Sequence, residues 1–415
     1  PRMRPPSVSR SLVTRALCLL PALRPPLVAR SIESEQLAPS TEPEQSVLPL
    51  ELCGGAYCLN YTIDKQLFRA VVDTGSPFVL VDGTCQDPRA RTLWGCYRGD
   101  GRPSGLAPTD ELFGGVDVGT EWRLGELALA PSFRPTAERQ WIAEGGEVSV
   151  AKIDDATFGV VRSFVDKGGG AVFLGLAKRR LPRIRPTFLE QTRVAAMRFD
   201  FVQRSLTLSA SPLVPRAADA VRTIDLRPRG APVATYAARI QRLVVNGEVV
   251  ELDRPAVCII DTGTTGCSVS DELFDNERLP QVWRDARIEL QTEKGALCAL
   301  EASVRKRRPA ARGIPPPSAR GIALDAREFD EFPLIVTPVR VPWFDADFGQ
   351  QECADGEPYQ CNGQPIGRRR SLLETLRVQL GDGLGEAPYV LFVGLAFYWQ
   401  RLLTIDIDEG RMTIE

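Results

Sequence analysis

The sequence VVDTGSPFVLV at residues 71–81 returns in a related form, CIIDTGTTGCSVS, at residues 258–270. In both stretches Asp-Thr-Gly follows a short apolar run, which is typical of a buried strand that ends in a tight turn. A carboxylate at the end of a buried strand is costly unless it is hydrogen-bonded or used in a reaction. The repeat therefore identifies Asp73 and Asp261 as candidate functional residues.

The likeness between the two halves of the chain extends beyond these stretches. Each half carries a later apolar run that contains Gly-Leu-Ala, AVFLGLA around Gly175 and VLFVGLA around Gly394. Each half also closes on a pair of strand-like runs, at residues 197–209 and 397–414. Such self-similarity predicts two related β lobes.

From about residue 50 onward, short alternating or apolar runs are separated by Gly, Pro and Asp, which is typical of strands and turns. VVNGEVV at residues 244–250 predicts a hairpin, because Asn-Gly suits a two-residue type I′ turn. Residues 271–280 predict a short helix. We therefore expect an all-β chain with one lobe at residues 50–210, a joint at 211–220 and a second lobe at 221–415.

The composition excludes several classes of function. Hydrophobic residues make up 43% and charged residues 25%, and the net charge is −2, so nucleic-acid binding is not expected. No apolar stretch is long enough for an integral membrane span. The chain contains no histidine, which excludes a Ser-His-Asp triad, a Cys-His pair and His-ligated zinc. Hydrolysis would have to use carboxylates, Lys, Tyr, Cys or water, and we expect neither a metal nor another cofactor.

The ten cysteines include three close pairs in loop-like sequence: Cys53 with Cys58, Cys85 with Cys96, and Cys353 with Cys361. We predict disulfides within these pairs, which would place the protein in an oxidising compartment. Spacing alone leaves the connectivity open, and buried free thiols are the alternative.

The first 32 residues are basic and contain no acidic residue, and a short apolar run lies at residues 16–23. This pattern resembles a secretory signal with Ala29 near a cleavage point, and an organelle transit peptide is the alternative. Residues 31–46 are acidic and contain proline, which is typical of a disordered spacer. We therefore assign residues 1–49 to a targeting leader and spacer, and expect a secretory, endomembrane or extracellular location.

A two-fold arrangement of the lobes would bring the two Asp-Thr-Gly loops together. Two carboxyl groups that face each other share one proton and titrate as a pair. The ionised carboxylate can then take a proton from a water molecule, while the protonated one polarises a substrate carbonyl. This chemistry hydrolyses an amide without histidine, metal or a covalent nucleophile.

These motifs resemble the pepsin-like aspartic proteases over about residues 50–415. The resemblance implies a bilobal fold with an active-site cleft between the lobes, and an endopeptidase that acts on peptide or protein substrates. We expect it to work as a monomer. The resemblance assigns Asp73 and Asp261 as the catalytic pair and places Gly175 and Gly394 beneath the two loops. The residues that it assigns to support the pair are Thr74, Gly75, Ser76, Thr262, Gly263 and Thr264.

The resemblance also implies a hairpin flap over the cleft, which we place at Phe113, Gly114 and Gly115. The family usually carries tyrosine at the flap position, so Phe113 keeps the aromatic ring but lacks the hydroxyl. Leu80 stands where the family often has a tryptophan that partners this tyrosine. A catalytically weak or inactive pepsin-like module, which binds a partner or acts as an inhibitor, is the alternative function.

Overall fold

We describe the protein from a computed structural model of the 415-residue chain. Residues 1–44 of the predicted leader and spacer, the predicted flap glycines Gly114 and Gly115, and the cysteine pair Cys353 and Cys361 lie outside the described residues. The described part belongs to one compact unit, Pro43–Glu415. The structure describes residues 45–53, 55–86, 93–99, 101–113, 116–138, 140–144, 149–164, 172–178, 185–229, 231, 233–303, 334–339, 341 and 388–415.

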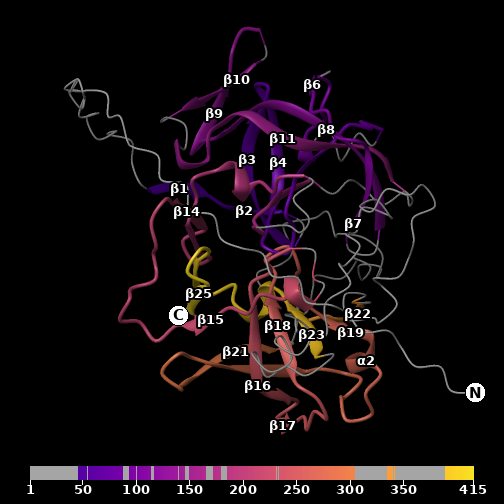
Figure 1. Cartoon of the computed structure of the whole chain (residues 1–415), viewed down its shortest axis with the longest axis vertical. Helices are drawn as coiled ribbons and strands as arrows, with labels where there is room; N and C mark the ends of the chain where they lie inside the picture. Colours follow the sequence, from indigo (N-terminus) through magenta and orange to yellow (C-terminus); the bar gives the residue numbers. More distant parts are fainter. Residues whose placement is uncertain are drawn as a thin grey trace, which may run out of the picture. The chain divides into compact units, whose positions relative to one another are not determined.

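Strands dominate the described residues, which confirms the all-β prediction (Figure 1). No helix among them is both long and apolar enough to cross a membrane. The helical segments described are short: α2 (Asp271–Phe274) and the 3-10 turns η1 (Ser149–Ala151), η2 (Leu189–Gln191), η3 (Arg227–Arg229) and η5 (Leu395–Phe397).

The first sheet is built from residues before position 176, and β7 (Thr109–Phe113) joins it through β8 alone. A separate two-stranded ribbon pairs β9 (Ser132–Pro135) with β10 (Trp141–Glu144). The strand order of the sheet is β2 (Glu51–Cys53), β3 (Ala56–Ile63), β4 (Gln66–Asp73), β12 (Phe173–Gly175), β5 (Val79–Asp82), β11 (Ile153–Phe164), β8 (Val116–Leu129) and β6 (Arg102–Pro103).

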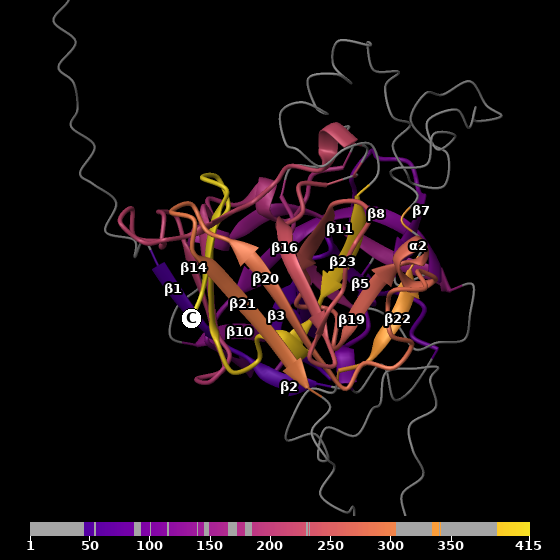
Figure 2. The same ribbon diagram turned by 90° about the horizontal axis from the view of Figure 1, so that it is seen from below.

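The second sheet is built from the later part of the chain, and Figure 2 shows most of its strands side by side. β17 (Glu248–Val249) pairs with β16 at its side. The strand order is β21 (Leu297–Ser303), β20 (Asp285–Gln291), β16 (Ala237–Val245), β18 (Ala256–Ile260), β23 (Tyr389–Val393), β19 (Cys267–Ser270) and β22 (Val336–Val339).

The two sheets repeat one pairing pattern. In the first sheet, β4 is antiparallel to β3 and parallel to β12, while β5 is antiparallel to β12 and parallel to β11. In the second, β18 is antiparallel to β16 and parallel to β23, while β19 is antiparallel to β23 and parallel to β22. Asp73 ends β4 and Asp261 directly follows β18, so the two aspartates occupy corresponding places.

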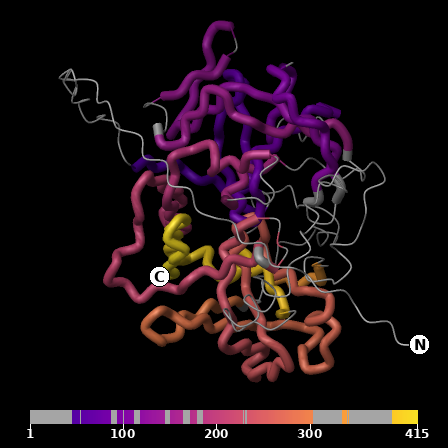
Figure 3. The backbone as a smooth tube through the Cα atoms, viewed as in Figure 1, coloured from indigo at the N-terminus to yellow at the C-terminus, as the bar shows by residue number. Residues whose placement is uncertain are grey.

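The third sheet combines the closing strand pairs of both halves, because β13 pairs with β24. Figure 3 shows the yellow C-terminal backbone, which leaves β23 of the second sheet and ends in β24 and β25 of the third. The order of the third sheet is β1 (Gln45–Pro49), β14 (Ser205–Ser209), β13 (Ala196–Asp200), β24 (Leu402–Asp406), β25 (Arg411–Ile414) and β15 (Val221–Arg222).

Strand β1 corrects the boundary of the predicted spacer. Its residues 45–49, which we assigned to the spacer at 1–49, pair along their whole length with β14. Leu48 is buried opposite Leu206, whereas its neighbours in β1 stay exposed or half-buried. A single buried leucine between exposed neighbours is too weak a pattern to predict a strand, so the pairing with β14 decides it.

Two local predictions are confirmed. The Asn-Gly hairpin joins β16 to β17, with Asn246 at φ 55° and Gly247 at φ 80°, as a type I′ turn requires. The helix predicted at residues 271–280 is present but ends at Phe274. The segment beyond it turns back through a bond from the amide of Asn276 to the Leu273 carbonyl.

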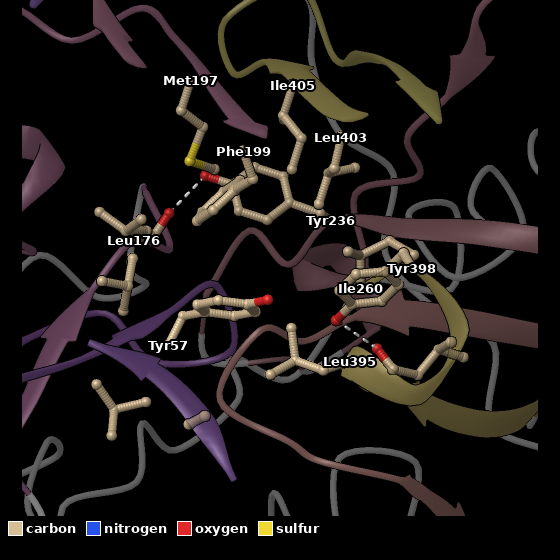
Figure 4. Packing of buried hydrophobic residues seen from close by; sticks show 14 of the residues in the cluster. Tyr57, Leu176, Met197, Phe199, Tyr236, Ile260, Leu395, Tyr398, Leu403 and Ile405 are labelled. Carbon is tan, nitrogen blue, oxygen red and sulfur yellow. Dashed lines mark hydrogen bonds between the residues drawn. The ribbon is translucent and has the colours of Figure 1, made fainter. Parts of the chain in front are cut away.

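One large buried cluster contains residues from both halves of the chain, and Figure 4 shows part of it. Tyr57, from β3, packs against Phe201, and Phe201 packs in turn against Tyr398, so aromatic rings from both halves are in contact. The Tyr236 hydroxyl donates to the Leu176 carbonyl at 2.5 Å, as the dashed line in Figure 4 shows. Burial of each such large apolar side chain contributes roughly 1.5–3 kcal/mol, so this core holds the loops in place.

Candidate active site

The two Asp-Thr-Gly loops brace each other through reciprocal hydrogen bonds. The Thr74 amide donates to Oγ1 of Thr262, and the Thr262 amide donates to Oγ1 of Thr74, each at 3.0 Å. The same hydroxyls donate onward, from Thr74 to the Ile260 carbonyl at 2.8 Å and from Thr262 to the Val72 carbonyl at 2.6 Å. These four buried hydrogen bonds hold the two loops against each other.

Each aspartate is held by its own loop in the same way. The Gly75 amide donates to Oδ1 of Asp73 at 2.8 Å, and the Gly263 amide donates to Oδ1 of Asp261 at 2.9 Å. The second carboxylate oxygen accepts a hydroxyl in both cases. The Ser76 hydroxyl donates to Oδ2 of Asp73, and the Thr264 hydroxyl donates to Oδ2 of Asp261 at 2.8 Å.

The carboxyl groups of Asp73 and Asp261 lie close together. A Cβ atom on Gly75 would stand 2.9 Å from the Asp261 carboxyl, and one on Gly263 would stand 2.5 Å from the Asp73 carboxyl. Each glycine thus lies against the aspartate of the other loop. Only a residue without a side chain allows this approach, which explains why both loops contain glycine at this position.

Burial raises the pKa of Asp261 well above its ordinary value, and the charge of Asp73 and a hydrogen bond with its carboxyl raise it further. Hydrogen bonds from Thr264 and Gly263 oppose this shift. As a whole residue Asp261 is only half-buried, but its carboxyl is enclosed by protein, and the enclosure of the carboxyl governs its protonation. Asp73 is 6% exposed. The pair therefore retains one proton above the pH at which a free aspartate loses it.

This shift predicts how stability depends on pH. Because the folded pKa of Asp261 is raised, its contribution to stability is fully present below the unfolded pKa of about 3.9 and is lost as pH rises through the folded pKa. Asparagine does not ionise, so the Asp261→Asn variant avoids this loss of stability at high pH. We expect its Tm to exceed the wild-type Tm by about 2 °C or more at pH 7. Thermal unfolding at pH 3 should show a smaller difference, and an equal difference at both pH values would contradict the assignment.

The two Gly-Leu-Ala segments pass directly beneath the loops. The Gly175 amide donates to the Phe78 carbonyl at 2.9 Å, and the Leu176 amide donates to the Asp73 carbonyl at 2.7 Å. In the second half, the Gly394 amide donates to the Gly266 carbonyl at 2.8 Å. Each segment therefore supports the backbone that carries its aspartate.

The predicted flap falls on a hairpin. Strand β7 pairs with β8 from Thr109 opposite Thr120 to Phe113 opposite Val116. Gly114 and Gly115 themselves, and the side chain of Phe113, lie outside what the structure describes. Their role at a cleft remains a prediction.

The side chains that pack around Leu80 could not be predicted from the sequence. Leu80 contacts a small buried cluster with Phe78 and Trp122, and the Trp122 indole nitrogen donates to Oγ1 of Thr109 at 2.9 Å. A tryptophan of β8 thus packs in the same small cluster as Leu80. No local pattern marks Trp122 for this place, because β8 is not paired with β5 directly and the two strands are far apart in the sequence.

The hydroxyl of Tyr398 is a second missed feature. It donates to the Asp261 carbonyl at 2.6 Å and to the Val393 carbonyl at 2.9 Å, from beneath the loop. Burial raises the pKa of this phenol, and the charges of Asp261 and Asp73 add to the shift, so it remains a neutral donor.

Two predicted disulfides are confirmed, Cys53–Cys58 and Cys85–Cys96. The first closes the turn between β2 and β3, and the carbonyl of Gly55 in this turn accepts a bond from the Thr265 hydroxyl at 2.7 Å. The turn therefore touches the second Asp-Thr-Gly loop. The free cysteines of the described chain are Cys258, Cys267 and Cys298, and burial raises the pKa of all three thiols.

Over the residues that the structure describes, no group of three or more Cys, Asp and Glu side chains is placed to hold a metal ion. No protein-family model matches the chain, and no curated protein is similar to it. The geometry of the two aspartates is therefore the main guide to function.

Proposed function

We propose that the protein is an aspartic endopeptidase with a bilobal pepsin-like fold, which hydrolyses peptide bonds by means of a water molecule activated between Asp73 and Asp261. The observation that carries this proposal is the reciprocal bracing of the two Asp-Thr-Gly loops through Thr74 and Thr262. This bracing sets two enclosed carboxyl groups against each other in matching hydrogen-bond environments.

The raised pKa of Asp261 assigns the shared proton to this residue. Asp73 then acts as general base and takes a proton from water, whose oxygen attacks the substrate carbonyl carbon. Asp261 donates its proton to the carbonyl oxygen, which gives a neutral tetrahedral diol. Asp73 then transfers its proton to the amide nitrogen, and the carbon–nitrogen bond breaks. One hydroxyl of the diol gives its proton back to Asp261 as the carboxylic acid product forms. No covalent intermediate with the protein forms.

The hydrogen bonds that the loops donate hold the carboxyl groups in place. The amides of Gly75 and Gly263 and the hydroxyls of Ser76 and Thr264 donate one bond to each oxygen of the two carboxyl groups, so each carboxyl keeps a fixed orientation. Proton transfer between positioned groups of this kind typically contributes 10²- to 10⁴-fold to a rate.

The substrate that fits this proposal is an extended peptide bound in a cleft between the lobes. An extended peptide can pair its backbone with strand edges, and we propose that the β7–β8 hairpin offers such an edge to the substrate. The two disulfides support a secretory, endomembrane or extracellular location, because disulfides persist in oxidising compartments.

The test is cleavage of an unfolded protein by the purified chain between pH 3 and pH 8. We expect activity to be highest in acid and to fall as pH rises through the pKa of Asp261, because the pair then loses its proton. A statine-type peptide, which mimics the tetrahedral diol, should inhibit at a ratio of one per chain.

Two results would count against the proposal. Cleavage that increases steadily to pH 8 would contradict a shared proton. Tight binding of statine-type peptides without any cleavage would favour the alternative, a catalytically inactive pepsin-like binding module.

A further inference from the structure

We propose that Arg185 is a positioning residue that locks the base of the β7–β8 hairpin to the loop that follows Asp73. The expected effect on catalysis rests on the proposed function. The contact between the hairpin and the loop does not depend on it. Arg185 lies in the segment between β12 and η2 and belongs to none of the motifs that identified the aspartates.

The first contact is a buried ion pair. The Arg185 side chain is 2% exposed, and its Nη2 lies 2.7 Å from Oε1 of Glu111, whose side chain is 7% exposed. Glu111 belongs to β7, two residues before the strand ends at Phe113. An ion pair so enclosed adds little net stability, because both charges lose their hydration, but it fixes one geometry, since either charge alone is costly.

The second contact is with two aromatic rings. The guanidinium carbon of Arg185 lies 5.2 Å from the ring centre of Trp122 and 5.7 Å from that of Phe78. The two rings contact each other edge to face, with centres 4.9 Å apart. Trp122 belongs to β8, and Phe78 belongs to the loop that carries Asp73 and Ser76. The guanidinium therefore contacts both the hairpin and the catalytic loop.

Thr109 completes the network. Its hydroxyl donates to Oε1 of Glu111 at 2.7 Å and accepts the indole hydrogen of Trp122 at 2.9 Å. The ion pair and the aromatic pair are thus parts of one buried unit. The unit joins both strands of the hairpin near the pair of Thr109 with Thr120, where the β7–β8 pairing begins.

The unit connects to Asp73 over a short path. The Phe188 amide, three residues beyond Arg185, donates to the Pro77 carbonyl at 2.9 Å. Pro77 lies between Phe78, which contacts the guanidinium, and Ser76, which donates to the Asp73 carboxylate. A change at Arg185 should therefore alter both the angle of the hairpin and the backbone next to Asp73.

The test replaces both charges together, because removal of one would leave the other buried and unpaired. In Arg185→Met/Glu111→Gln, the glutamine still accepts the Thr109 hydroxyl, so folding should be retained. We expect kcat/KM for a peptide substrate to fall by about tenfold to a hundredfold, as small misplacements typically cause. We also expect amide hydrogen exchange in residues 109–122 to accelerate at least about tenfold.

Arg411→Met is the matched control. Arg411 is 9% exposed and pairs with Glu293 at 3.0 Å, but it lies in β25 of the third sheet. The Arg411→Met substitution should lower the Tm without changing kcat/KM or the amide hydrogen exchange of residues 109–122. Arg185→Lys is a second variant if the double variant does not fold: it keeps the charge but loses the planar contact with both rings, and should show both effects in weaker form.

The exchange and activity measurements separate the two proposals. Unchanged exchange of residues 109–122 in folded Arg185 variants would overturn the locking. Faster exchange with unchanged kcat/KM would overturn the positioning role. If the wild-type chain cleaves no peptide, the proposed function fails, and the exchange measurement alone decides whether Arg185 locks the hairpin.

Discussion

Asp73→Asn and Asp261→Asn are each expected to lower kcat/KM by roughly a thousandfold, because each removes one of the two partners in proton transfer. Asparagine keeps the shape of the side chain and still accepts the loop amides, so the loops should remain braced through Thr74 and Thr262. The measurement is peptide cleavage at the pH optimum, normalised to the folded fraction. Combining both substitutions should cost little more than one, because the carboxyls act as a unit.

Asp406→Asn is the matched control for this prediction. Asp406 is also a buried aspartate, and its carboxylate accepts the amides of Leu213 and Val214, but it lies in β24 of the third sheet. Its substitution should leave kcat/KM unchanged for the folded fraction. If Asp73→Asn and Asp261→Asn behave like this control, the two aspartates are not catalytic.

Gly394→Ala should have the largest effect on stability, with a loss of about 3 kcal/mol or more in the free energy of unfolding. Its Cβ would lie 2.2 Å from the Thr264 carbonyl oxygen and 2.5 Å from the Gly266 carbonyl oxygen. Both obstacles are backbone atoms of the second Asp-Thr-Gly loop, so no side-chain rotation relieves the clash. Because the loop must move, the Thr264 hydroxyl would also leave Asp261, and activity should be lost.

Gly105→Ala separates this clash from the general cost of replacing glycine. Gly105 has φ +76° and no atom within 4 Å of an added Cβ, so its substitution should cost only about 1–2 kcal/mol for a left-handed backbone. Denaturant unfolding measures both variants. Equal losses at Gly394 and Gly105 would show that the segment beneath the loop is less tightly packed than the structure indicates.

The features that could be predicted from the sequence are local. The Asn246-Gly247 hairpin follows from the left-handed backbone that its turn requires. The disulfides Cys53–Cys58 and Cys85–Cys96 join cysteines that are close in sequence. The aspartates stand out because the same short motif occurs behind two buried strands, and a repeated motif is visible without any knowledge of contacts.

The features that could not be predicted depend on contacts between distant segments. Strand β1 forms because β14 offers it a partner, although only Leu48 of its five residues is buried. Arg185 looks like one more arginine in an arginine-containing segment, and only the packed structure places it against Glu111 and Trp122. Leu80 is a similar case, because the sequence does not show that Trp122 packs in the same cluster.

By itself, the sequence determined that this protein has two carboxylates in matched strand-end turns, and that histidine takes no part in its chemistry. Strand and turn propensities act between neighbouring residues, so they are readable along the chain. Only the tertiary structure decided that the glycine of each turn lies against the aspartate of the other, that burial raises the pKa of Asp261, and that Arg185 contacts both Glu111 of the hairpin and Phe78 of the first turn. Burial and the approach of two charges depend on distances in space, which arise only when segments far apart in sequence pack together.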